Sequence, residues 1–143
     1  MKPYKIGYTT GVFDLFHVGH LNILKRAKEQ CEFLIVGVST DELVQQYKFK
    51  QPVIPYHERV EIVKGIKFVD EVVSQTNRDK FSAWENLHFN VMFVGDDWKG
   101  DPLFERIENQ FSQVGVDIVY FPYTKGVSST ELKEKIQYKV KVI

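Results

Sequence analysis

The sequence has little of three things, and each shortage excludes a class of protein. Nineteen lysines and arginines balance nineteen aspartates and glutamates, so no overall positive field attracts nucleic acid, and we expect none to bind. Cys31 is the one cysteine, which excludes an internal disulfide and predicts a reducing, cytoplasmic location. Neither an apolar run of about 20 residues nor a signal-peptide pattern occurs, so we expect no membrane insertion.

Apolar runs and helical periods alternate along all 143 residues, a length that fits one domain over residues 1–143. Strands are expected at residues 5–10, 33–39, 69–73, 91–95 and 116–121. Helices are expected at residues 18–30, 56–66, 78–88, 102–114 and 128–137, with an irregular stretch at 44–55 and either a loose tail or an edge strand at 138–143. The alternation predicts an α/β fold with a single doubly wound, mostly parallel five-stranded Rossmann-like sheet and helices on both faces.

Histidine is scarce, and two of its four occurrences, His17 and His20, fall in the turn between the first expected strand and the first expected helix. A helix N-terminus attracts anions through its free N–H groups and its dipole. Imidazole donors at that position can hold a phosphate and stabilise the charge that grows on its oxygens. Gly19 lets the backbone approach closely. We therefore predict a phosphate site here, the alternative being an ordinary turn with incidental histidines.

Further polar clusters follow the second, fourth and fifth expected strands, at residues 39–42, 95–98 and 124–130. In a parallel sheet the carboxyl ends of the strands share one edge, and ligands bind beyond that edge. The clusters should therefore converge with the histidine turn on one active site.

The ordered motifs make the chain resemble a known family. Phe13-Asp14 and His17-Val18-Gly19-His20 match the G-x-F-D-x-x-H-x-G-H pattern of the cytidylyltransferases, a branch of the HxGH nucleotidyltransferase superfamily. Further blocks agree in order and spacing at residues 39–42, 56–59, 68–72, 95–100 and 126–130. The resemblance covers residues 5–136, and within the family the chain is most similar to the glycerol-3-phosphate cytidylyltransferases.

The resemblance implies transfer of CMP from CTP to a small phosphate monoester, with release of pyrophosphate and formation of a CDP-alcohol. Glycerol 3-phosphate is the first expected acceptor, with choline phosphate or ethanolamine phosphate next. Mg²⁺ bound with CTP and a homodimer are also implied. Two alternatives stay open: ATP-dependent adenylyl transfer to a sugar phosphate or phosphopantetheine, and a nucleotide-binding domain that has lost catalysis.

The resemblance also implies roles for particular residues. Catalysis is assigned to His17, His20 and Lys48. Nucleotide contacts are assigned to Thr10, Gly11, Phe13, Asp14, Gly19, Arg59, Asp96, Ser128, Ser129 and Thr130. Acceptor contacts are assigned to Lys50, Asp97, Trp98 and Lys125, and no residue is assigned to a metal. Simpler alternatives are a surface ion pair for Arg59, a helix cap for residues 128–130 and a core position for Trp98.

The late motif departs from the family pattern, which reads Arg-Thr-Glu-Gly-Ile-Ser-Thr. Here Tyr123 stands in place of the arginine and Lys125 in place of the acid. The loss of a guanidinium removes a bidentate phosphate clamp whose geometry lysine does not reproduce. We hypothesise that Lys125 restores the missing charge; the alternative is that the change alters the acceptor.

Overall fold

Five parallel strands form a sheet in the computed structural model, which describes residues 2–122 and 128–142. They are β1 (Tyr4–Gly11), β2 (Cys31–Ser39), β3 (Glu71–Gln75), β4 (Val91–Gly95) and β5 (Asp117–Phe121). Their order is β3-β2-β1-β4-β5, and each neighbouring pair runs parallel. The predicted doubly wound α/β sheet is confirmed.

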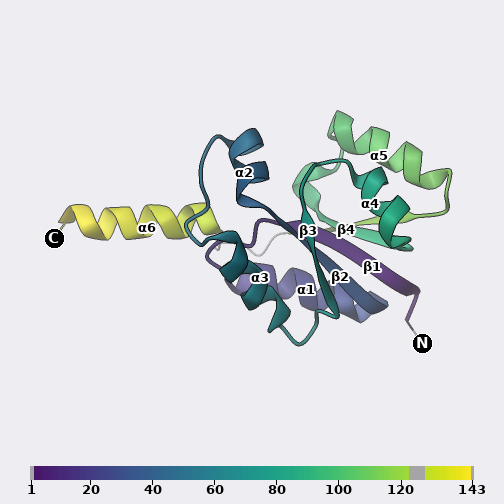
Figure 1. The fold of residues 1–143 in the computed structure, drawn as a ribbon, viewed down its shortest axis with the longest axis horizontal. Coiled ribbons are helices and arrows are strands. Elements are labelled where there is room, and N and C mark those ends of the chain that lie inside the picture. Colours follow the sequence, from purple (N-terminus) through teal and green to yellow (C-terminus); the bar gives the residue numbers. More distant parts are fainter. Residues whose placement is uncertain (1, 123–127, 143) are drawn as a thin grey trace.

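Helices cover both faces of this sheet (Figure 1). They are α1 (Val18–Gln30), α2 (Asp41–Lys48), α3 (Tyr56–Lys64), α4 (Lys80–Leu87), α5 (Pro102–Ser112) and α6 (Ser129–Val142), with a short 3₁₀ turn, η1 (Asp96–Trp98), after β4. Figure 1 shows α1 and α3 on one face, α4 and α5 on the other, and α6 projecting away from the body of the molecule. Within the described part of the chain, none of the helices combines the length and apolar character needed to cross a bilayer.

The apolar run of β2 explains why both faces are covered. Leu34 belongs to the core that contains Leu24 of α1, whereas its neighbour Ile35 belongs to the core that contains Phe111 of α5. All four side chains are buried. Because successive side chains of a strand point to opposite faces, a strand between two helical layers must be apolar at nearly every position.

Two local expectations differ from the structure in the central part of the chain. Much of α2 falls in the stretch expected to be irregular, and it forms because the Thr40 hydroxyl caps it by accepting the N–H of Leu43 at 3.2 Å. β3 starts at Glu71, two residues after the expected start at Val69. The residue before it, Asp70, uses its carboxylate to accept the N–H of Leu34 in β2 at 2.7 Å.

The expectation of an edge strand at residues 138–143 is wrong over the described residues, whereas the alternative of a loose tail stays a prediction. Residues 138–142 continue α6, which begins at Ser129. A helix that has already formed its first turns extends at little further entropic cost, so a short alternation of apolar and polar residues does not suffice to start a strand.

Candidate active site

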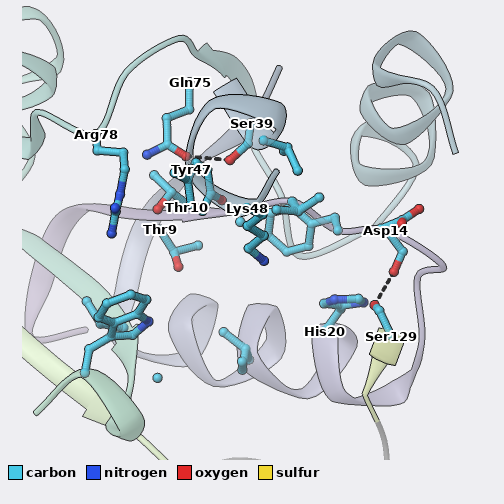
Figure 2. Close-up of a pocket in the computed structure, with 18 of the residues that line it drawn as sticks. Thr9, Thr10, Asp14, His20, Ser39, Tyr47, Lys48, Gln75, Arg78 and Ser129 are labelled. Atoms are coloured by element: carbon cyan, nitrogen blue, oxygen red, sulfur yellow. Dashed lines mark hydrogen bonds between the residues drawn. The ribbon is translucent and has the colours of Figure 1, made fainter. Parts of the chain in front are cut away.

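A cavity of about 340 Å³ opens at the carboxyl ends of β1 and β4, where the strand order reverses. Segments far apart in the sequence meet there, and Figure 2 shows His20, Lys48 and Arg78 around the same opening. The polar and charged lining residues are Thr9, Thr10, Asp14, His20, Ser39, Tyr47, Lys48, Lys50, Gln51, Gln75, Arg78, Lys80, Ser129, Thr130 and Lys133. Each predicted polar cluster contributes to the lining, through Ser39, through Gly95 and Trp98, and through Ser129 and Thr130, whereas the other described members of these clusters do not line it.

Two histidines cap α1 with their side chains. Nδ1 of His17 accepts the N–H of Gly19 at 3.0 Å, and Nδ1 of His20 accepts the N–H of His17 at 3.1 Å. The two rings are stacked with their centroids 3.9 Å apart. This is a capping box in which imidazoles take the places usually held by Ser and Glu. Because each Nδ1 accepts a hydrogen bond, each neutral ring carries its proton on Nε2.

The protonation of these rings determines what they offer to a ligand. Burial lowers the pKa of His20 to about 4, and the nearby His17 lowers it too while Asp14 partly opposes the shift. Burial also lowers the pKa of His17. Both rings are therefore neutral at pH 7, with an Nε2–H donor on each. His20 lines the cavity, and His17 lies behind it in the stack.

Asp14 joins three segments of the chain. Its carboxylate accepts the N–H groups of Val53 and Ile54 at 2.8 and 2.9 Å and pairs with Lys133 of α6 at 3.1 Å. Its backbone carbonyl accepts the hydroxyl of Ser129 at the start of α6 (Figure 2). Burial would raise the pKa of Asp14, but the two N–H donors and Lys133 outweigh burial and hold this pKa below its ordinary value. The charged carboxylate thus holds both segments against the histidine turn.

The backbone of this turn is strained on both sides of Asp14. Phe13 and Leu15 have φ values of 56° and 49°, in the left-handed region that side chains other than glycine rarely adopt. Phe13 is buried and contacts the His20 ring with centroids 5.4 Å apart. Such strain persists only where the surrounding contacts determine the conformation, which is typical of functional sites.

Lys80 enters the cavity from the start of α4. Its Nζ donates to the Thr10 hydroxyl, at the end of β1, at 3.0 Å. Burial, together with the charge of Arg78, lowers the pKa of Lys80 to about 8. An anion bound beside this ammonium would stabilise its charged form.

The cavity is strongly cationic. Its five cationic lining residues are Lys48, Lys50, Arg78, Lys80 and Lys133. Asp14 is the single acid among the described residues that line it. Partial burial lowers the pKa of Lys48, and the charges of Lys50 and Lys133 lower it further. Because these charges repel one another until an anion enters, the arrangement favours a polyphosphate ligand.

Arg59 lies behind the cavity instead of lining it. Its buried guanidinium donates to the carbonyls of Ile54, Val12 and Ser39 at 2.9, 2.6 and 2.8 Å. It also pairs with the Asp41 carboxylate at 2.6 Å. These bonds hold the ends of β1 and β2 against α3, which makes Arg59 a positioning residue. The predicted contact between Arg59 and the nucleotide stays a prediction.

The structure brings some predicted site residues to the cavity and leaves others outside. Those that line it are Thr10, Gly11, Phe13, Asp14, His20, Lys48, Lys50, Trp98, Ser129 and Thr130. Those that do not are His17, Gly19, Arg59, Asp96, Asp97 and Ser128. Asp96 and Asp97 are exposed on η1, and the Ser128 hydroxyl caps α6 by accepting the N–H of Glu131 at 3.0 Å. Tyr123 and Lys125 lie outside the described residues, so the compensation hypothesis stays a prediction.

Several lining residues were not predicted from the sequence. They are Tyr47, Gln75, Arg78, Lys80 and Lys133, among others. Gln75 ends β3, where its side-chain oxygen accepts the Ser39 hydroxyl at 2.8 Å, and Arg78 and Lys80 follow within five residues. The rule that polar residues at the end of a parallel strand meet at one edge applies to them, but the strand expected at residues 69–73 ends two residues before Gln75, and the helix expected at residues 78–88 includes Arg78 and Lys80.

No cluster of three or more His, Cys, Asp or Glu side chains suited to a metal ion occurs among residues 2–122 and 128–142 as far as they are described. The Asp14 carboxylate is already engaged by two N–H groups and Lys133.

The chain is similar in sequence to several known proteins. The sequence model of the family described as cytidylyltransferase-like matches residues 8–135. A glycerol-3-phosphate cytidylyltransferase of Bacillus subtilis (strain 168) is 38% identical over 129 residues, which cover 90% of this chain and 94% of that protein. A FAD synthase of Thermococcus sibiricus is 35% identical over 124 residues, covering 85% of this chain and 84% of that protein.

The fold also occurs among solved structures. The lipopolysaccharide core biosynthesis protein of Thermoplasma volcanium matches with a TM-score of 0.71, covering 87% of this chain and 99% of that chain. Its sequence identity is 22%, so the likeness concerns the fold alone.

Proposed function

The chain belongs to the cytidylyltransferase-like family of nucleotidyltransferases, and we propose that it transfers CMP from CTP to glycerol 3-phosphate, yielding CDP-glycerol and pyrophosphate. The observation that carries this proposal is the cavity, in which an imidazole donor of the H-x-G-H turn meets five cations around one opening. Similarity along nearly the whole chain to a glycerol-3-phosphate cytidylyltransferase supports the choice of acceptor.

The reaction is a displacement at the α-phosphorus of CTP. An oxygen of the acceptor's phosphate forms the new P–O bond, and the bond between the α-phosphorus and the oxygen bridging to the β-phosphorus breaks. The electron pair of that bond leaves with pyrophosphate. A phosphate monoester is largely ionised near pH 7, so the nucleophile needs no general base. The enzyme must instead bring two anions together and stabilise the charge on the phosphoryl oxygens.

The neutral imidazoles and the lysines have different roles in this reaction. His20, with His17 stacked behind it, donates Nε2–H to the phosphoryl oxygens, and the capping hydrogen bonds hold the ring in place beforehand. Lys48 and Lys50 lower the repulsion between the two anions. Lys80, which donates a hydrogen bond to Thr10, binds the acceptor phosphate in this proposal.

Three further parts complete the proposal: Mg²⁺ and a homodimer, which the resemblance to the family implies, and a cytoplasmic location, which the sequence predicts. The phosphates of CTP would hold Mg²⁺, which would lower their negative charge. The protein works as a homodimer, which sedimentation analysis would test. It works in the cytoplasm, where the lone Cys31 stays reduced.

Pyrophosphate release tests the proposed reaction. CTP and ATP are each supplied with Mg²⁺ and with glycerol 3-phosphate, choline phosphate, ethanolamine phosphate or a sugar phosphate. We expect release only when CTP and glycerol 3-phosphate are both present, with CDP-glycerol identified by mass spectrometry. Release that requires ATP and a sugar phosphate would contradict the proposal in favour of adenylyl transfer. Binding of CTP without release from any mixture would contradict it in favour of a non-catalytic domain.

A further inference from the structure

An arginine contacts two aromatic rings at the cavity. Arg78, in the segment between β3 and α4, lines the cavity together with Tyr47 of α2 and Trp98 of η1. Its guanidinium carbon lies 4.9 Å from the centroid of the Tyr47 ring and 5.8 Å from the centroid of the Trp98 ring. Both distances are within the range of about 6 Å for cation–π attraction. Figure 2 shows Arg78 extending into the opening.

Aromatic faces grouped at a cavity are a common means of binding a quaternary ammonium ligand. Here the protein's own arginine already lies over both faces. Its charge also contributes to the lowered pKa of Lys80 and of Lys48. A ligand with a cationic group would meet this repulsion and would have to displace Arg78 from the two rings.

The same guanidinium suits a different kind of ligand. It presents a planar fork of N–H donors, which binds phosphate, carboxylate and hydroxyl oxygens. Arg78 is exposed, so these donors are accessible to a molecule that enters the cavity. The acceptors considered for this enzyme share a phosphate monoester, so the phosphate cannot distinguish them, whereas the charge of the head group can.

We propose that Arg78, held against Tyr47 and Trp98, is a specificity-determining residue that favours acceptors with a hydroxylated or anionic head group and rejects those with a cationic head group. The inference rests on the proposed function and deepens it, because it separates glycerol 3-phosphate from choline phosphate and ethanolamine phosphate.

Two substitutions test the role of the charge. Arg78→Met removes the charge while keeping an aliphatic stem, and Arg78→Lys keeps the charge. The measurement is kcat/KM for CTP-dependent pyrophosphate release with glycerol 3-phosphate and with choline phosphate. We expect Arg78→Met to lower the ratio of kcat/KM for glycerol 3-phosphate to kcat/KM for choline phosphate about 100-fold. About tenfold would come from a lower value for glycerol 3-phosphate and about tenfold from a higher value for choline phosphate. Arg78→Lys should keep most of the preference. Arg106→Met, which removes an exposed arginine of α5 outside the cavity, should leave the ratio unchanged.

Calorimetric titration of both acceptors, with and without a non-hydrolysable CTP analogue, separates selectivity from turnover. The wild type could release no pyrophosphate and still bind glycerol 3-phosphate in preference to choline phosphate, with Arg78→Met abolishing that preference. This result would overturn the proposed reaction and support the role of Arg78. If Arg78→Met leaves the preference for glycerol 3-phosphate intact, in turnover or in binding, the proposed role of Arg78 is overturned, whatever the reaction.

Discussion

The two ring nitrogens of His20 have separate tasks. Nδ1 accepts the N–H of His17 and so stabilises the start of α1, whereas Nε2 carries the proton that a phosphate oxygen can accept. Asparagine places an oxygen acceptor near the position of Nδ1 but offers no donor near the position of Nε2. A single substitution therefore separates the capping role from the proposed catalytic role.

We expect His20→Asn to lower kcat about 100-fold while leaving the protein folded, because one donor to the transition state is lost. KM for CTP should change less than kcat, since the lost contact strengthens as the phosphoryl charge develops. Steady-state kinetics and a thermal melt check both parts. His57→Asn, at an exposed position of α3, is the matched control and should behave like the wild type. A normal kcat in His20→Asn would remove His20 from the mechanism.

At the scale of the elements, buried polar bonds hold the cavity walls as much as apolar packing does. Arg59 of α3 bonds to carbonyls at the end of β2 and in the turn after β1. Asp14 in that turn binds α6 through Lys133 and Ser129. Buried carbonyls and carboxylates that lose such partners carry a desolvation penalty, so each of these residues supports more than one element.

We expect Arg59→Met to lower the free energy of unfolding by about 3 kcal/mol or more, because it leaves buried carbonyls and Asp41 without their donor. Urea unfolding at pH 7 measures this. Arg106→Met on α5 removes an exposed arginine and should stay within about 0.5 kcal/mol of the wild type. Unchanged stability with a raised KM for CTP would instead support the nucleotide contact that the sequence predicts for Arg59.

At the scale of the whole molecule, the buried histidine makes stability depend on pH. The pKa of His20 is about 4 in the folded protein and 6.5 ordinarily. Between these values the unfolded chain binds a proton that the folded chain does not, so stability falls as pH drops from 6.5 towards 4. The pKa of Lys80, lowered from 10.5 to about 8, affects stability in a separate pH range, between 8 and 10.5.

We expect the wild type to lose up to about 2 kcal/mol of unfolding free energy between pH 7 and pH 5 through His20. Urea unfolding of the wild type and of His20→Asn at both pH values isolates this contribution. The variant should lose less stability than the wild type, and His57→Asn should lose as much. An equal loss in the wild type and in His20→Asn would show that other groups cause the pH dependence.

The sequence by itself determined the fold class and the position of the histidine turn. Both depend on local information: the period of the apolar residues separates strands from helices, and the H-x-G-H spacing places two imidazoles at one helix start. A parallel sheet then requires that residues after β1, such as Asp14, lie at the ligand-binding edge.

Only the tertiary structure decided which distant residues meet at that edge and which are buried behind it. Lys80 contacts Thr10 although 70 positions separate them, and nothing local to either residue indicates the contact. The sequence around Arg59 is typical of an exposed helix surface, yet α3 packs this residue against carbonyls of two other segments. Such contacts depend on how the sheet brings its strands and helices together, which a one-dimensional pattern does not contain.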